Sequence, residues 1–227
     1  MKAHDISTAR VTGAVGTNKV RCCLYADAMD RKTVGAQLRK QFFPLLVEAG
    51  FTRKGDVLHR ELPGPVVHVV DVQHRPRSGV FQVNLGAHLL ALGDVAGGTV
   101  PPTAQMRDYD CAWRGSIISG FRNSSDSEFA YGSTEDEAAE SVAFLASEWQ
   151  RQSSLFFDPL SSYPDGFHAR AEQALDEDLH PAHLRVWANV AVIVGDSELS
   201  KRIAAAALPR VTERATALRD SLEALLA

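Results

Sequence analysis

The sequence predicts an α+β fold: an antiparallel meander sheet of four or five strands packed on helices, followed by a C-terminal helical extension. Three segments between residues 57 and 89 alternate apolar and polar side chains, which is typical of strands with distinct faces. Two short connections, PGP and PRSG, separate these segments, and apolar residues recur at helical spacing before and after them. A chain of 227 residues, 45% hydrophobic and 23% charged, is long enough to bury a sizeable core.

The N-terminal part divides into a polar segment and a predicted helix. Residues 1–29 are polar and aperiodic, so we expect either a flexible tail or a mis-assigned start, with translation beginning at Met29. Apolar residues then recur at helical spacing, and Gly50 follows as a C-terminal cap. Pro44 predicts a kink or break near Phe43. The apolar positions of this helix are Val34, Leu38, Phe42, Leu45, Leu46 and Ala49.

The three strands VLHREL, VVHVVDVQHR and VFQVNLGAHL pair through their two connections. This pairing sets Leu62 opposite Val66 and His74 opposite Phe81. It gathers the apolar residues on one face, whereas a slip of one residue would expose that whole set. The apolar set is Leu58, Leu62, Val66, Val70, Val72, Phe81, Val83, Leu85, Ala87 and Leu89, joined by Arg60, His68 and His74.

The opposite face of these strands is polar and is the candidate functional surface. Gln73 lies opposite Gln82 and Asp71 opposite Asn84, within reach of cross-strand hydrogen bonds. We expect this face either to be solvated or to bind something. Its members are His59, Glu61, Asp71, Gln73, Gln82, Asn84 and His88.

Short sequence patterns predict the elements between residues 91 and 137. Residues 91–105 are expected to form a loop, residues 107–118 a further strand and residues 128–131 a short one. Thr134 and Glu137 have the capping-box spacing of a helix start.

The C-terminal part is predicted to be helical. Pro181 and Gly195 bracket one helix, and Asp196 opens the next. We therefore expect an α+β domain over residues 30–158 and a helical extension packed on it over residues 159–227.

Composition excludes several functional classes. No apolar run is long enough to span a membrane, and the N-terminus lacks the apolar core of a secretory signal, so we expect a cytoplasmic protein without a membrane partner. Cys22, Cys23 and Cys111 have no disulfide or zinc spacing, so reduced thiols and no metal or other cofactor are expected. No Lys/Arg cluster with interleaved aromatic residues is present, so no nucleic-acid partner is expected. The oligomeric state stays open.

Several segments together carry a family resemblance. The block LRKQFFPLLVEAGFTRKGDVLHRE, followed by VVHVVDVQHRPRSGVFQVNLG and DYDCAWRGSI, resembles the bacterial domain of unknown function numbered 4304, over roughly residues 32–118. The resemblance implies a fold and a bacterial origin, and the family has no established activity or ligand. Its positions here are Gly50, Phe51, Arg53, Lys54, Arg60, Gln73, Phe81, Asn84 and Gly86.

Two chemical interpretations of the polar face can be compared. A metal site would need Glu61 and His88 to converge from strands about 9–10 Å apart, which disfavours it. Acid–base chemistry would use Asp71 with His59 diagonal to it. No serine elbow, phosphate-binding loop or dinucleotide fingerprint accompanies them.

We therefore expect a non-enzymatic module that binds an unknown protein or small-molecule ligand across the polar sheet face. The alternative is an enzyme of unknown reaction that uses Asp71 and His59. A deep concavity that contains a carboxylate with a strongly shifted pKa would favour the enzyme. A flat, exposed face would exclude it. The predicted binding residues are Arg60, Asp71, Gln73, Gln82, Asn84 and Arg114.

Overall fold

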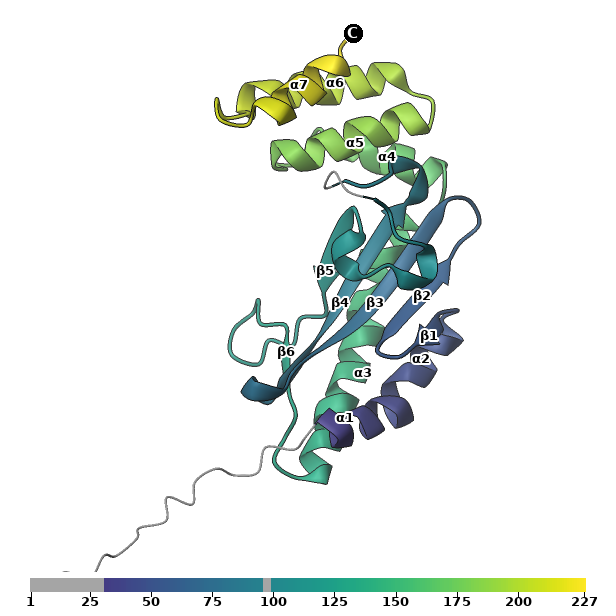
Figure 1. Cartoon of the computed structure of the whole chain (residues 1–227), viewed down its shortest axis with the longest axis vertical. Coiled ribbons are helices and arrows are strands. Elements are labelled where there is room, and N and C mark those ends of the chain that lie inside the picture. The colour runs from purple at the N-terminus through teal and green to yellow at the C-terminus, as the bar shows by residue number, and fades with distance from the viewer. Residues whose placement is uncertain (1–30, 96–98) are drawn as a thin grey trace, which may run out of the picture.

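The computed structural model describes residues 31–95 and 99–227, and it has the predicted α+β fold (Figure 1). The expectation for residues 1–29 lies outside the described residues. An antiparallel sheet runs in the order β1–β2–β3–β4–β5, and β6 pairs with β4 farther along the edge that β5 occupies. The strands are β1 (Thr52–Lys54), β2 (Val57–Glu61), β3 (Val66–Arg75), β4 (Val80–Leu89), β5 (Trp113–Ser116) and β6 (Glu128–Ala130).

The register of the three central strands is the predicted one. His74 pairs with Phe81, Asp71 with Asn84 and Gln73 with Gln82. At the other connection, the Leu62 N–H donates to the Val66 carbonyl at 3.0 Å. The hydrophobic period of two determined this register, because a slip would have moved the core residues to the other face.

Two strand predictions need correction. Strand β1 was not predicted, because its residues Thr-Arg-Lys are all exposed and carry no apolar alternation. The strand expected over residues 107–118 is shorter, because Asp108–Asp110 form a 3-10 turn. In that turn the Asp110 Oδ2 accepts a hydrogen bond from the Arg107 N–H at 2.8 Å, a side-chain bond that competes with strand pairing.

Helices cover the apolar face of the sheet, as predicted. Helix α1 (Arg31–Gln37) continues through a π-turn (Leu38–Phe42) into α2 (Phe43–Glu48), and the long α3 (Glu135–Phe157) lies alongside them. The π-turn ends at Phe42, two residues before Pro44, which cannot donate a helical hydrogen bond, so the expected irregularity is present. Trp149 of α3 is buried with its ring edge-on to Phe42, with 5.8 Å between the ring centroids.

The remaining helices pack at one end of the sheet (Figure 1). They are α4 (Asp165–Gln173), α5 (Pro181–Ile193), α6 (Ser197–Ala207) and α7 (Thr216–Ala224). Gly195 has a φ of +91° after α5, and the Asp196 Oδ1 accepts the Leu199 N–H at 2.9 Å, so both predicted helix boundaries are confirmed. No helix in residues 31–95 and 99–227 is long and apolar enough to cross a membrane.

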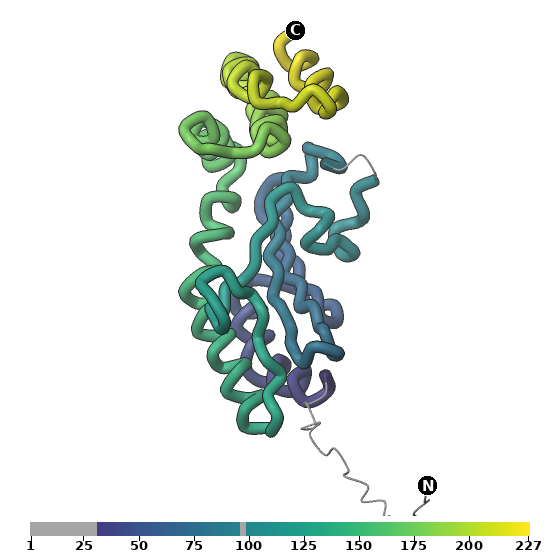
Figure 2. The backbone as a smooth tube through the Cα atoms, turned by 90° about the vertical axis from the view of Figure 1, so that its left-hand side faces the viewer, coloured from purple at the N-terminus to yellow at the C-terminus, as the bar shows by residue number. Residues whose placement is uncertain are grey.

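The polar face of the sheet is only partly accessible. Residues 99–112, hereafter the covering segment, lie on the face opposite α3 (Figure 2). Met106 and Cys111 of this segment are buried together with Val67 and Val69 of β3. The stretch VVHVV of β3 is apolar at consecutive positions, which is typical of a strand buried on both faces. The covering segment therefore leaves the polar face accessible along β5 and at the end of the sheet near the β3–β4 turn, where Gln73, Gln82 and Asn84 are half-buried.

Candidate functional site

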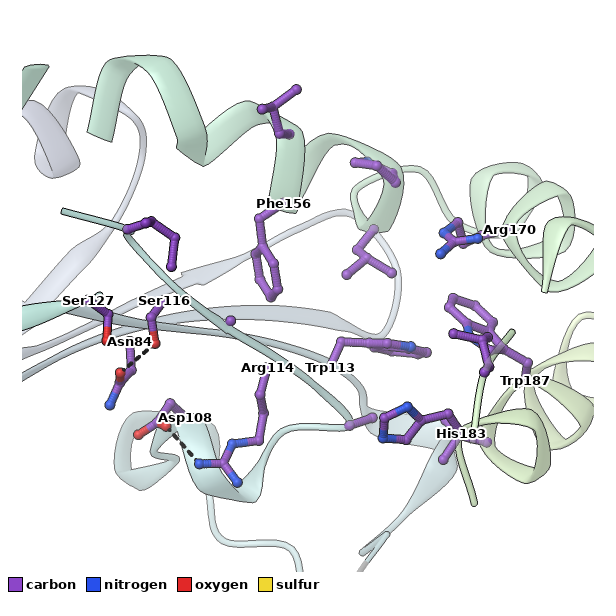
Figure 3. Close-up of a pocket in the computed structure, with 18 of the residues that line it drawn as sticks. Asn84, Asp108, Trp113, Arg114, Ser116, Ser127, Phe156, Arg170, His183 and Trp187 are labelled. Atoms are coloured by element: carbon purple, nitrogen blue, oxygen red, sulfur yellow. Dashed lines mark hydrogen bonds and ion pairs between the residues drawn. The ribbon is translucent and has the colours of Figure 1, made fainter. Parts of the chain in front are cut away.

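A cleft of about 800 Å³ lies beside the edge strand β5 (Figure 3). Its walls are β5, the C-terminal end of α3, and helices α4 and α5. This volume is in the range of small-molecule and peptide sites. One end is polar and the other aromatic, and we call the whole the β5 cleft. Its lining includes Asn84, Asp108, Arg114, Ser116 and Ser127 at the polar end, and Trp113, Phe156, Arg170, His183 and Trp187 at the aromatic end.

Hydrogen bonds order the polar end. The Ser116 hydroxyl donates to the Asn84 Oδ1 at 2.9 Å across the β4–β5 pair. The Arg114 guanidinium donates to the Asp108 Oδ2 at 3.2 Å, and Gln73 donates to the Asp108 Oδ1 at 3.1 Å. Asp108 is only 2% exposed, so its position is determined by these two donors. The arrangement presents the Asn84 amide and the Arg114 guanidinium to a ligand, and the Ser116 hydroxyl holds the amide in place.

Asp71 lies behind this polar end and is buried. Burial raises the pKa of the Asp71 carboxyl to about 6, and the neighbouring Asp108 carboxylate adds to the increase. The Arg107 guanidinium lies 3.4 Å from the Asp71 Oδ1, and its positive charge acts in the opposite direction by lowering this pKa. The Asp71 Oδ2 accepts no hydrogen bond from the described residues. A protonated Asp71 is able to donate this missing bond to Asp108.

Aromatic rings form the other end of the cleft. The indoles of Trp113 and Trp187 pack with 4.8 Å between their centroids. Phe156 of α3 lies so close to β5 that a Cβ at Gly115 would be 3.0 Å from its ring. On the same wall, Leu155 is 75% exposed, which is unusual for a side chain of this size and polarity.

The predicted binding residues divide between several places. Asn84 and Arg114 line the cleft, and Asp71 and Gln73 lie behind it. Gln82 donates to the hydroxyl of Ser127, a lining residue, at 3.0 Å. Arg60 lies on the helix-covered face.

The pair predicted for acid–base chemistry is not brought together around the cleft. The His59 Nε2 lies 2.8 Å from the Met106 carbonyl of the covering segment, and neither His59 nor Asp71 lines the cleft. The two residues belong to the buried part of the polar face, at 9% and 1% exposure.

Sequence reasoning missed much of the lining. Asp108 lies in a 3-10 turn outside the alternating pattern, and Trp187 and His183 lie on a helix far along the chain. The signal that points to Trp187 is the nearly continuous apolar stretch VWANVAVIV, which predicts a buried helix but not what it packs against.

Gly86 allows the covering segment to approach the sheet. An added Cβ would lie 2.6 Å from the Cys111 Sγ and 3.2 Å from the Asp108 Cα. We expect Gly86→Ala to lower the free energy of unfolding by about 1–2 kcal/mol. Urea denaturation measures this, and Cys111→Ala in the same chain should restore part of the loss. Gly35→Ala is the control, because its Cβ would have ordinary contacts and should be neutral or stabilising. A neutral Gly86→Ala would contradict this close packing.

No group of three or more His, Cys, Asp or Glu side chains in residues 31–95 and 99–227 is placed to hold a metal ion.

The geometry defines the protein as an α+β sheet domain with a cleft at an open sheet edge. Residues 42–143 match the model of a protein family described as domain of unknown function (DUF4304), which confirms the predicted resemblance. The match includes the sheet and the start of α3, and with them the polar end of the β5 cleft. Phe156, Arg170, His183 and Trp187 lie beyond it. No curated protein and no solved structure matches the chain.

Proposed function

We propose that this protein is a non-enzymatic binding module of the bacterial cytoplasm and that its ligand occupies the β5 cleft. The observation that carries the proposal is the cleft itself, about 800 Å³ in volume, with a hydrogen-bonding end and an aromatic end. The predicted binding residues Asn84 and Arg114 line it. In this proposal the helical extension, residues 159–227, supplies the second wall of the cleft.

The chemistry of the lining favours binding over catalysis. The Ser116 hydroxyl donates to an amide oxygen rather than to a base, so it is not activated as a nucleophile. Burial raises the pKa of the Cys111 thiol to about 12, which keeps it protonated and inert, as is usual for a structural cysteine of the cytoplasm. Asp71 has the pKa of a general base, but it is buried and does not line the cleft.

The charges of the lining favour an anionic amphipathic ligand. Arg114 and Arg170 both line the cleft, and Asp108, the carboxylate among the lining residues, is paired with Arg114. The guanidinium of Arg170 lies 5.5 Å from the Trp187 ring centroid and is paired with the Glu177 carboxylate at 2.7 and 3.0 Å, so Arg114 is the main contact for an anionic group.

Binding of an aromatic sulfonate tests the cleft. We expect 1-anilinonaphthalene-8-sulfonate to bind wild-type protein and to bind Leu155→Glu about tenfold more weakly, because the new carboxylate repels the sulfonate. Fluorescence titration measures this. Leu155 is exposed, so the fold should tolerate the change.

Val47→Glu is the matched control, because Val47 is a 56% exposed apolar residue of α2 that does not line the cleft. Equal affinity of all three proteins would place the dye elsewhere and remove the β5 cleft as the proposed site.

A further inference from the structure

We propose that the ligand of the β5 cleft is an extended peptide segment of a partner protein, with alternating apolar and acidic side chains, which adds a strand to the sheet at β5. This inference rests on the proposed binding site and names the class of its ligand.

The outer edge of β5 carries unpaired backbone groups. The Ile117 N–H donates to the Val83 carbonyl of β4 at 2.9 Å. In an antiparallel ladder every second residue bonds to the partner strand, and the β4–β5 register is continuous with this bond. The N–H and C=O groups of Arg114 and Ser116 therefore point away from β4. They face the cleft, which both residues line.

The same sheet edge is closed beyond Ser116, in the direction of β6. The side-chain amide of Gln152 accepts from the Ile118 N–H and donates to the Ile118 carbonyl, both at 2.8 Å, as a neighbouring strand would do. Farther along, the Ser141 hydroxyl donates to the Ala130 carbonyl of β6 at 2.7 Å. No comparable bond to the outward groups of Arg114 and Ser116 occurs between the described residues. The edge is therefore open at Arg114 and Ser116 and closed beyond them, and an open edge is a template for strand addition.

The opposite edge of the sheet, formed by β1, is not suited to strand addition. Strand β1 has only three residues, all exposed, and two of them are Arg53 and Lys54. Short and charged edge strands resist pairing with another chain.

Side chains beside β5 determine what a peptide strand would carry. Successive residues of an added strand point to opposite faces of the sheet. On the α3 side they would meet Leu155, which is 75% exposed, and the ring of Phe156. On the other side they would meet Arg114, whose side chain is 56% exposed and has donors beyond the one that Asp108 uses. Apolar residues therefore fit one face and acidic residues the other.

A proline substitution in β5 tests the backbone contact. Ser116→Pro removes the outward N–H without removing a bond to β4, and edge strands tolerate such prolines. Ser116→Ala is the matched control, because it keeps the N–H and loses only the hydroxyl that donates to Asn84. The probe is a fluorescein-labelled octapeptide of alternating valine and glutamate, titrated into the full chain by fluorescence anisotropy. We expect Ser116→Pro to weaken binding at least about tenfold and Ser116→Ala less than about twofold.

Two further measurements keep the proposal testable if Ser116→Pro does not fold. Hydrogen exchange of the wild-type protein should show that the amides of Arg114 and Ser116 become protected when the octapeptide binds. An octapeptide that is N-methylated at its glutamates should lose affinity by a similar factor, because it has lost backbone donors. A valine–lysine octapeptide should not bind.

Several results would overturn the proposal. Equal loss of affinity in Ser116→Pro and Ser116→Ala would assign the contact to the side chain. A dimer of the full chain that Ser116→Pro dissociates would identify the occupant as a second copy. Binding of the aromatic sulfonate without binding of the octapeptide would remove the peptide and leave the cleft as a small-molecule site. Binding of neither would remove the proposed function as well.

Discussion

Replacing Arg60 with Met is expected to lower the free energy of unfolding by about 3 kcal/mol. The Arg60 guanidinium donates to the Ala49 carbonyl at 2.9 Å and lies 2.9 Å from the His68 Nδ1. It also lies 4.6 Å from the centroid of the Phe51 ring. Methionine fills the space but leaves the carbonyl and the imidazole without their donor, and each unsatisfied buried group costs about 1–3 kcal/mol.

Urea denaturation of Arg60→Met measures this loss. Arg39→Met is the control, because Arg39 is an exposed residue of the π-turn and its replacement should be nearly neutral. A loss of less than about 1 kcal/mol for Arg60→Met would show that this guanidinium does not hold α2 and β2 together. Unchanged affinity for the octapeptide in the folded variant is expected, since Arg60 lies on the other face of the sheet from Arg114.

Asp71→Asn is expected to stabilise the protein by up to about 3 kcal/mol at pH 8 and to change its stability little at pH 4. The pKa of the Asp71 carboxyl is raised from 3.8 to about 6, chiefly by burial. A carboxyl with a raised pKa in the folded state contributes stability that is complete below the unfolded pKa. That stability is lost as the pH rises through the folded pKa. Asparagine does not ionise, so the difference between the two proteins should grow between pH 4 and pH 6.

His68 has to be separated from this effect because it acts with the opposite sign. Burial lowers the pKa of the His68 imidazole from 6.5 to about 4, so wild-type stability falls as the pH drops through that range. His68 is the same in both proteins, and the difference between their unfolding free energies at each pH isolates Asp71.

Chemical denaturation at several pH values measures the Asp71 prediction. Asp220→Asn on the exposed side of α7 is the control. Its unfolding free energy should differ from that of the wild type by the same amount at every pH. A constant destabilisation of Asp71→Asn at every pH would mean that the native protein holds this carboxylate ionised and well paired.

A stabilising Asp71→Asn would also bear on function. Side chains that cost stability are retained in proteins mainly where a site needs them. Asp71 lies behind the polar end of the cleft and interacts with Asp108, a lining residue that is paired with Arg114. The affinity of Asp71→Asn for the octapeptide therefore tests whether the negative charge of Asp71 alters how strongly Arg114 binds acidic side chains.

The sheet could be predicted from the sequence because local patterns specify it. The alternation in β3 and β4 and the short connections allow one register that buries the apolar set, and the structure has that register. The helix boundaries at Thr134, Pro181 and Asp196 were likewise predictable, since capping depends on a few neighbouring residues.

The site could not be predicted in the same way. Periodicity says which residues share a face but not what lies on that face, and the covering segment carries no regular pattern. The predicted polar face was therefore only partly available, and Asp71 and His59 became buried residues. The lining residues Phe156, His183 and Trp187 come from α3 and α5, which meet β5 only through tertiary packing.

The sequence by itself determined the strands, their register and the identity of the polar residues, because these depend on side-chain periodicity and on short turns. Only the tertiary structure decided which of those residues a ligand can reach. It buried Asp71 under the covering segment, placed α5 beside Trp113 and left the outward backbone groups of Arg114 and Ser116 facing a cleft. The physical reason is that burial and edge exposure are set by contacts between segments distant in the chain, which no local pattern encodes.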